Sequence, residues 1–462
     1  MAILELRILP PIAIGRLGSS ETPLEAFDLE VSPTKPLDYR AIVPQETLAV
    51  DPATGAIRGS HVPREIKFKD GNQIRPVAPF LEVFARTADD VLEPLTLDLL
   101  AGEGLTIDAI QWSVEVGNIK IFRRTGDPKD RIVAKMEGIR DHDAHALLGE
   151  CENFFDGKQL PLGSVRFIRP TQDYPEIRFR FTPAAGKVYG ASLKRHTSAD
   201  VEIDDPVLSA DRILYNPEKG TWRGYSESAG PGLTNPAQIY AGYPDDSGNQ
   251  VSWGYFDDEC DGTVTVELTL KSGQKLTASA RISAGPPAFA PDTLPVRTVS
   301  DEIEQILYGP ALNAQEAPIE AAQDVLRRAF ETVRLMNTAV MNGNTIFGRT
   351  NIASTMVRQD SSDFNRRYQP ITATSIVDNL AILALHQRAF VGVSAGTAPW
   401  FASVLRQPEE VGDLSDEARR KMPALMRGAD GRALVLTRRM IDAVTKAATS
   451  AMFRGPEGED GK

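Results

Sequence analysis

Alternation of apolar and polar side chains constrains the fold more than any other feature of this sequence. In residues 107–123 four apolar side chains fall on alternate positions, and residues 263–270 repeat the pattern. Because successive side chains of a strand point to opposite faces of a sheet, each segment predicts a strand with one buried face. The turn Lys271-Ser-Gly-Gln274 and the run 275–282 predict that the second strand continues into a β-hairpin.

Other runs within residues 1–298 also indicate strands. Ile177-Arg-Phe-Arg-Phe-Thr182 alternates, and glycines and prolines are dense between the runs, which is typical of a β-sandwich or a large irregular β-domain. Few segments of helical length separate the strands, which argues against a parallel α/β fold. Asp141–Glu150 is an exception and predicts a short helix. We expect residues 1–298 to form a β-rich, sandwich-like domain.

The pattern changes at Gly285-Pro-Pro-Ala-Phe-Ala-Pro291, where three prolines in seven residues end a strand and begin a connector. Beyond it, apolar side chains between Ala322 and Val340 recur at three- and four-residue spacing. That spacing places them on one face of an amphipathic helix, which we expect over residues 316–341.

Two more helices complete the expected fold. Residues 374–390 are apolar on most sides and predict a buried helix, and residues 437–452 predict another. The Gly- and Glu-rich residues 453–462 predict a disordered tail. The fold class is therefore expected to be α+β, with the β-rich domain followed by a helical domain over residues 299–452.

Length and charge limit the domain count and the class of partner. A chain of 462 residues is larger than one hydrophobic core usually supports, which predicts two or three domains. Fifty-one Lys and Arg against 63 Asp and Glu give a net charge of −12. Nucleic acids and anionic membranes are themselves negative, so this charge disfavours both as partners.

Cysteine content and hydropathy indicate the compartment. Only Cys151 and Cys260 occur, which excludes a disulfide scaffold and a four-cysteine metal site within one chain. Sparing use of cysteine fits a reducing compartment. The start lacks a basic region and carries Glu5 in its apolar run, so it predicts no secretory signal. No run approaches the roughly 20 apolar residues of a membrane-spanning helix. We expect a cytoplasmic protein.

Three short motifs are compatible with chemistry. Gly392-Val-Ser-Ala-Gly396 matches the nucleophile elbow of hydrolases, but all five histidines precede Ser394 and the segment before it reads as helix, so a Gly-rich loop is favoured. Asp141-His-Asp-Ala-His145 would place His142 and His145 on one helix face, close enough to share a metal. No third ligand is evident, and a solvated polar turn is the favoured interpretation.

The third motif, Asp257-Asp-Glu-Cys-Asp-Gly262, places carboxylates at alternate positions like the start of a calcium loop, which makes Asp257 and Asp261 candidate ligands. Its twelfth position is Leu268 where bidentate Glu is required, so an acidic turn into a strand is favoured. The segment Gly15-Arg-Leu-Gly-Ser-Ser20 is too short for a phosphate fingerprint and predicts a turn whose amides form a nest.

Several segments together resemble one family, the L-lysine ε-oxidases and glycine oxidases, which carry a cysteine tryptophylquinone built from their own side chains. The segments occur in the family's order along the chain. They are Ile12–Ser20, Ile110–Lys120, Trp253-Gly-Tyr-Phe-Asp-Asp-Glu-Cys-Asp-Gly-Thr-Val264, Ala284–Pro291, and the late stretches Met422-Pro-Ala-Leu425 and Leu434-Val-Leu-Thr-Arg-Arg-Met440.

The resemblance also implies where the quinone should lie. In the family its cysteine follows the helix that here spans 437–452, and its tryptophan lies further on. This sequence has no cysteine from residue 261 onward and no tryptophan after Trp400. We therefore expect a shortened member that lacks the quinone-bearing segment, has no cofactor, and acts as a structural or partner subunit with a protein partner or by self-association.

Two alternatives remain. A relocated pair, Trp253 and Cys260 with Asp257 as the proton acceptor, would make the chain an oxidoreductase acting on primary amines or amino acids. A partner chain supplying the redox centre would do the same. Only the relocated pair would give the chain a cysteine tryptophylquinone of its own. The other alternative is a small-molecule or metal-binding protein that uses the clusters 141–145 or 257–261.

Overall fold

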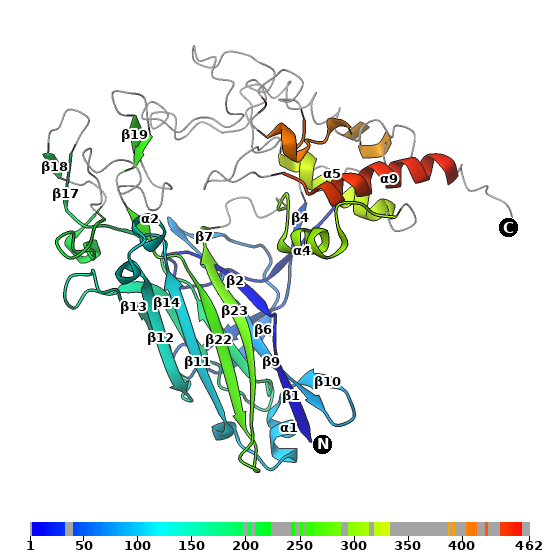
Figure 1. Cartoon of the computed structure of the whole chain (residues 1–462). Coiled ribbons are helices and arrows are strands. Elements are labelled where there is room, and N and C mark those ends of the chain that lie inside the picture. The colour runs from blue at the N-terminus through cyan, green and yellow to red at the C-terminus, as the bar shows by residue number, and fades with distance from the viewer. Residues whose placement is uncertain are drawn as a thin grey trace. The chain divides into compact units, whose positions relative to one another are not determined.

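The chain divides into two compact units. The first comprises Met1–Asp28 and Val43–Phe289, and the second Leu29–Ile42 and Ala290–Lys462. The structure is a computed structural model (Figure 1). It describes residues 2–32, 40–196, 202–204, 208–222, 242–244, 250–252, 255–287, 294–313, 318–332, 387–388, 390–392, 403–411, 413, 421–423 and 435–454.

A six-stranded antiparallel sheet forms one layer of the first unit. Its strand order is β1-β9-β15-β14-β13, and β10 also pairs with β9. The strands are β1 (Ile3–Leu9), β9 (Phe80–Thr87), β10 (Leu92–Pro94), β13 (His145–Gly149), β14 (Leu160–Phe167) and β15 (Arg178–Thr182). The alternating run at 177–182 is therefore a strand, as predicted.

A five-stranded sheet forms the other layer, in the order β12-β11-β22-β23-β2. The strands are β2 (Ile12–Arg16), β11 (Ile110–Asn118), β12 (Ile132–Ile139), β22 (Cys260–Thr269) and β23 (Lys275–Gly285). Strand β2 runs parallel to β23, and the other pairs are antiparallel. The predicted hairpin is confirmed, because Thr269 pairs with Lys275 and Gly273 adopts a φ of 83° in the turn.

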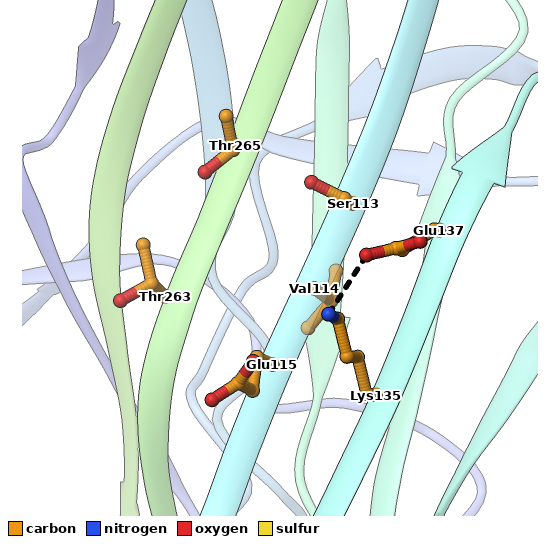
Figure 2. A pocket seen from close by; sticks show the side chains of 7 residues that line it. All are labelled: Ser113, Val114, Glu115, Lys135, Glu137, Thr263 and Thr265. Atoms are coloured by element: carbon orange, nitrogen blue, oxygen red, sulfur yellow. Dashed lines mark ion pairs between the residues drawn. The ribbon is translucent and has the colours of Figure 1, made fainter.

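The outer face of the five-stranded sheet is polar. A hollow of about 260 Å³ lies on this face. Lys135 and Glu137 of β12 line it and form an ion pair at 2.8 Å, which is the dashed line in Figure 2. Its lining residues are Ser113, Val114, Glu115, Lys135, Glu137, Thr263 and Thr265. Ligand pockets are mostly apolar and concave, so this polar sheet surface does not qualify as one.

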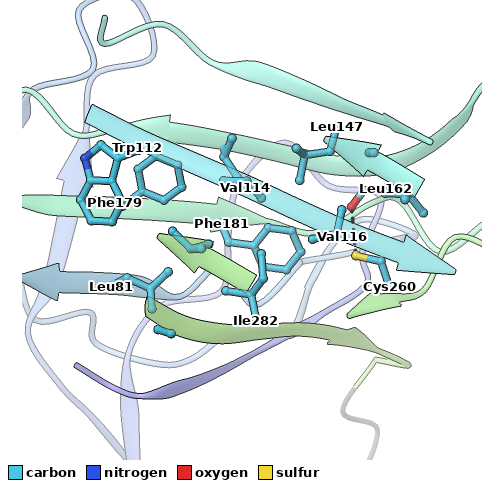
Figure 3. Close-up of a cluster of buried hydrophobic side chains, with 14 of the residues drawn as sticks. Leu81, Trp112, Val114, Val116, Leu147, Leu162, Phe179, Phe181, Cys260 and Ile282 are labelled. Carbon is cyan, nitrogen blue, oxygen red and sulfur yellow. Dashed lines mark hydrogen bonds between the residues drawn. The ribbon is translucent and has the colours of Figure 1, made fainter. Parts of the chain in front are cut away.

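The inner faces of the two sheets share one hydrophobic core (Figure 3). Trp112 of β11 is fully buried and stacks on Phe179 of β15, with ring centroids 4.5 Å apart and planes at 22°. Leu81 and Phe181 from one sheet and Val114 and Ile282 from the other belong to the same cluster. Two sheets packed on a shared core form a sandwich, and the β-rich prediction is confirmed.

The other elements assigned up to residue 257 are short, and two of them, β3 and β4, include residues of the second unit. These short elements are the strands β3 (Phe27–Glu30), β4 (Ala41–Pro44), β5 (Thr47–Val50), β6 (Ile57–His61), β7 (Lys69–Asp70), β8 (Gln73–Ile74), β16 (Val188–Tyr189), β17 (Lys194–His196), β18 (Glu202–Asp204), β19 (Gly242–Pro244), β20 (Gln250–Ser252) and β21 (Phe256–Asp257), the helices α1 (Leu97–Gly102) and α2 (Phe122–Thr125), and the 3₁₀ turns Ile107–Ala109, Pro128–Asp130 and Ala210–Arg212.

The helix predicted over Asp141–Glu150 is wrong, because His145–Gly149 forms strand β13. The Asp141 carboxylate accepts a hydrogen bond from the backbone N–H of Asp143 at 3.0 Å. Such a local side-chain bond gives the backbone an alternative to the helix. Leu147 is then buried between exposed neighbours, the period of a strand rather than a helix.

Three helices of the second unit have described bounds, and residues 387–388 and 390–392 are helical as well. The three helices are α4 (Val299–Tyr308), α5 (Ile319–Glu331) and α9 (Arg438–Arg454), with a 3₁₀ turn at Pro408–Glu410. Helices α5 and α9 lie within or close to the predicted spans 316–341 and 437–452, and they contribute buried side chains to one apolar cluster. Most of the predicted helix over 374–390, and residues 455–462 of the predicted tail, lie outside the described residues.

Ion pairs connect distant segments of this second unit. Arg40 pairs with Glu331 of α5, and both side chains are almost fully buried. The same Glu331 carboxylate accepts the backbone N–H of Leu294 at 3.3 Å. Arg328 makes two hydrogen bonds with Asp301 of α4, at 2.7 and 3.2 Å. Among the described residues, no helix has the length and apolar character needed to cross a membrane.

Candidate functional site

Segments that resemble the oxidase family meet at one end of the five-stranded sheet. Strand register aligns Arg16 with Gly285 and aligns Cys260 with Ala284 on the other side of β23. It also places Asp261 opposite Gly117, at the end of β11. The ends of β2, β11, β22 and β23 therefore bring together residues that are up to about 270 positions apart in sequence.

A charged cluster occupies this end, and we define it as Asn118, Lys120, Asp257, Asp258 and Glu259. The Lys120 ammonium donates to the carboxylates of both Asp257 and Glu259. The Asp257 side chain is fully buried, whereas that of Lys120 is 21% exposed. One cation therefore balances two carboxylates, and charge-assisted bonds of this kind are the stronger class of hydrogen bond.

Asn118 holds the acidic turn against β11. Its side-chain N–H₂ donates to the backbone carbonyls of Asp257 at 2.8 Å and Glu259 at 2.9 Å. Its side-chain oxygen accepts the backbone N–H of Lys120 at 3.0 Å. A buried amide that makes three such bonds satisfies backbone groups that would otherwise be unpaired, so its role is structural.

Asp258 is the most perturbed acid of the charged cluster. One oxygen accepts the backbone N–H groups of Gly186 at 3.1 Å and Lys187 at 2.9 Å, and the other is buried without a partner among the described residues. Burial raises the pKa of Asp258 to about 7, and the nearby Asp257 carboxylate adds to the rise. Burial also raises the pKa of Glu259.

The contribution of Asp258 to stability is expected to fall as the pH rises from about 4 to about 7. The pKa of Asp258 is higher in the folded state than the ordinary 3.8, so the folded state binds more protons within that window. The stabilisation is fully present below the unfolded pKa and is lost as the pH rises through the folded pKa. Thermal unfolding followed by circular dichroism at a series of pH values measures it.

Asp258→Asn is the matched control, because the amide keeps an oxygen to accept the two backbone N–H groups but does not ionise. We expect wild type to lose stability relative to the variant as the pH rises from about 4 to about 7. A constant difference between the two proteins over this range would show that Asp258 titrates at its ordinary pKa.

Both cysteines are free and held as neutral thiols. Cys260 faces the sandwich core, where its Sγ donates to the carbonyl of Leu162 at 3.5 Å (Figure 3), and Cys151 Sγ donates to the carbonyl of Lys129 at 3.0 Å. Burial raises the pKa of each thiol to about 12. Since the thiolate is the reactive form, neither cysteine is a prepared nucleophile.

Of the relocated pair Trp253 and Cys260, the structure describes only Cys260. Trp253 lies outside the described residues, so its pairing with Cys260 stays a prediction. The described tryptophans are core residues: besides Trp112, Trp222 packs edge-on against Tyr215 at 5.0 Å and Phe256 at 5.5 Å. Ser394 also lies outside the described residues.

The structure has no helix face on which His142 and His145 could share a metal, which agrees with the polar turn favoured for this motif. His142 Nδ1 lies 3.0 Å from the Phe167 carbonyl, and burial lowers the pKa of the ring. His145 Nε2 instead lies 2.6 Å from the Asp141 carboxylate. The reason is the strand at β13, which replaces the helix face that the two rings would have shared.

The acidic motif at residues 257–262 has a structural explanation. The acidic turn enters strand β22 at Cys260, and a Cβ on Gly262 would lie 1.9 Å from the carbonyl of Glu115, so close strand approach explains this glycine. Asp257 pairs with Lys120 while Asp261 is exposed on the strand. In the described part of the chain, no three His, Cys, Asp or Glu side chains are placed to hold a metal ion.

The amide nest predicted at Gly15–Ser20 is also wrong. The backbone N–H of Leu17 donates to Gly285 at 2.9 Å, that of Gly18 to Ala184 at 3.2 Å, and that of Ser20 to Ile74 at 2.9 Å. These donors point to carbonyls of neighbouring segments, so they are not available to an anion.

A second buried polar group was not predicted at all. The carboxylate of Asp130 is fully buried and accepts the Tyr215 hydroxyl and the Asn153 amide, each at 2.8 Å, and the Thr125 hydroxyl. Asn153 and Tyr215 lie 23 and 85 positions from Asp130 in sequence, so these side chains form no local motif. Lys120 was missed for the same reason, because its partners Asp257 and Glu259 lie 137 and 139 positions away in sequence.

Comparisons with known proteins give a distant likeness. No protein-family model matches the sequence, and no curated protein is detectably similar. Among solved structures, the L-Lys epsilon-oxidase from Marinomonas mediterranea is similar with a TM-score of 0.44 and 14% identity, and its Schiff base intermediate with L-Lys has a TM-score of 0.43 and 14% identity. A further structure of this oxidase has a TM-score of 0.41 and 13% identity. Each match covers 96% of this chain and 61% of the oxidase, and no function is transferred from it.

Proposed function

We propose that this chain is a non-catalytic relative of the cysteine tryptophylquinone amino-acid oxidases and acts as a structural or binding partner subunit in an oxidase-like system. The resemblance of its ordered segments supports the relationship. The single observation that carries the non-catalytic part is the position of Cys260, whose thiol faces the core of the sandwich.

The charged cluster supports the same proposal. Amine oxidation through a cysteine tryptophylquinone needs a cysteine joined to an oxidised indole and a carboxylate that can accept protons from the substrate. Asp257, the candidate acceptor, is fully buried and ion-paired with Lys120. Its turn is held by Asn118. These groups bond one another, which suits a scaffold better than a site open to substrate.

A purified native preparation tests the proposal. We expect a colourless protein without a quinone absorbance band, no hydrogen peroxide release with L-lysine, glycine or simple primary amines, and elution in a complex larger than one chain. The physical reason is that neither neutral thiol, buried at Cys260 and half-buried at Cys151, is disposed to form the thioether. Absorbance, peroxide release and light scattering on one sample measure all three.

Cys260→Ser separates this proposal from the oxidoreductase alternative. If peroxide release is observed and is abolished in Cys260→Ser but kept in Cys151→Ser, the relocated centre is correct and the non-catalytic proposal fails. A single uncomplexed chain would contradict the partner role.

A further inference from the structure

The outer face of the six-stranded sheet carries two arginines directly opposite each other. Arg166 of β14 pairs in register with Arg180 of β15, which in turn pairs with Phe80 of β9. Side chains of directly paired residues lie about 5 Å apart at their Cβ atoms, and like charges in such positions repel. The repulsion between Arg166 and Arg180 is therefore unfavourable unless a negative group lies nearby.

A carboxylate balances the neighbouring arginine but not Arg180. Arg178, two residues before it on the same face, is 2.7 Å from Glu82 and 2.9 Å from Glu176. Within the described residues, Arg180 makes no ion pair or hydrogen bond, and its Nε is buried without an acceptor. Its guanidinium lies over the Phe80 ring, 4.9 Å from the centroid.

Arg166 is also without a negative partner among the described residues. It donates to the backbone carbonyls of Asp51 at 3.2 Å and Pro52 at 2.7 Å, in the turn between β5 and β6, and its Nε is buried without an acceptor. Burial and the Arg166 charge lower the pKa of Arg180 to about 10, in keeping with an uncompensated cation. Arg166 is thus held in place by neutral groups, with its charge unbalanced.

Two hydroxyl side chains adjoin the arginine pair. Ser164 and Thr182 also pair in register across β14 and β15. Each lies two residues from an arginine, so strand alternation places all four side chains on the same face. This face of the sheet therefore places two arginine and two hydroxyl residues at neighbouring positions.

We propose that this face binds the phosphate group of a small anionic ligand. Guanidinium groups bind phosphate through paired N–H donors, and each bond is strengthened by the opposite charges. A phosphate has more acceptor oxygens than a carboxylate, so it matches two arginines and two hydroxyls better. This site goes beyond the proposed function and does not depend on it.

Inorganic phosphate is the probe, and thermal unfolding and isothermal titration calorimetry are the readouts. We expect phosphate to raise the melting temperature of the full chain, whereas sodium chloride at the same ionic strength and acetate do so much less. In Arg180→Gln the phosphate-dependent rise should disappear, and the affinity should fall at least tenfold. Without phosphate, Arg180→Gln should melt no lower than wild type, because an uncompensated charge is gone.

Arg281→Gln is the matched control, since Arg281 lies on the outer face of the other sheet and donates to the Thr263 hydroxyl at 2.9 Å. It should keep the full phosphate effect. Arg180→Lys keeps the charge but loses the paired donors, and it should retain only part of the affinity. The proposal is overturned if Arg180→Gln and Arg180→Lys both keep the wild-type response, if chloride gives the same rise, or if acetate binds more tightly than phosphate.

Discussion

Replacing Lys120 with methionine is expected to lower the free energy of unfolding by about 3–5 kcal/mol, the usual cost of removing one partner from a buried ion pair. The ammonium is the group that balances Asp257 and Glu259, and the Asp257 side chain is fully buried. Methionine has a similar length and fills the same space without the charge. Urea denaturation followed by circular dichroism measures the loss.

Lys135→Met is the control for this measurement. Lys135 lies on the outer face of the same sheet and pairs with Glu137 at 2.8 Å, but both side chains are more than half exposed. Solvent screens such a pair, so the unfolding midpoint should stay at the wild-type value within error. Equal losses in the two variants would mean that the charged cluster contributes no more than a surface ion pair.

Trp112→Ala is expected to cost about 3–5 kcal/mol, because truncating a fully buried aromatic side chain leaves a cavity that the core fills only in part. Trp112 joins the two sheets through its stacking on Phe179 at 4.5 Å and its contact with Phe167 at 6.0 Å between ring centroids. The same denaturation experiment measures the loss.

Trp112→Phe is the control variant, because it removes less of the buried side chain. It keeps a ring against Phe179 and sacrifices no hydrogen bond, since the indole N–H is buried without a partner among the described residues. We expect it to lose less than half as much stability as Trp112→Ala. Equal losses in both variants would indicate that the indole makes a specific interaction that the packing account omits.

The sequence predicted the strands whose inner faces are apolar and missed those whose pairing depends on distant residues. Strands β11, β22 and β23 follow from local alternation, because one face of each packs in the core. The helix predicted over Asp141–Glu150 was wrong because the Asp141 side chain bonds a nearby backbone N–H, and the residues that follow form strand β13.

The candidate site was predicted only at its acidic turn. Asp257 and Cys260 stand out as a local motif, but the contact of Lys120 with Asp257 spans 137 positions and leaves no local signal. Nothing in the sequence indicated that Leu29–Ile42 belongs to the second unit. The Arg40–Glu331 ion pair within that unit joins residues 291 positions apart. Local alternation of apolar and polar residues predicts which side chains are buried. Ion pairs between distant residues depend on the tertiary fold and are not visible in the local sequence.

The mass of the purified chain most directly tests the proposal that it makes no redox cofactor of its own. After unfolding, we expect a mass equal to that of the unmodified sequence and alkylation of both Cys151 and Cys260. Three results together would contradict the proposal. The mass would differ by the atoms that indole oxidation and cross-linking add and remove, Cys260 would resist alkylation, and its peptide would be joined to the peptide of Trp253.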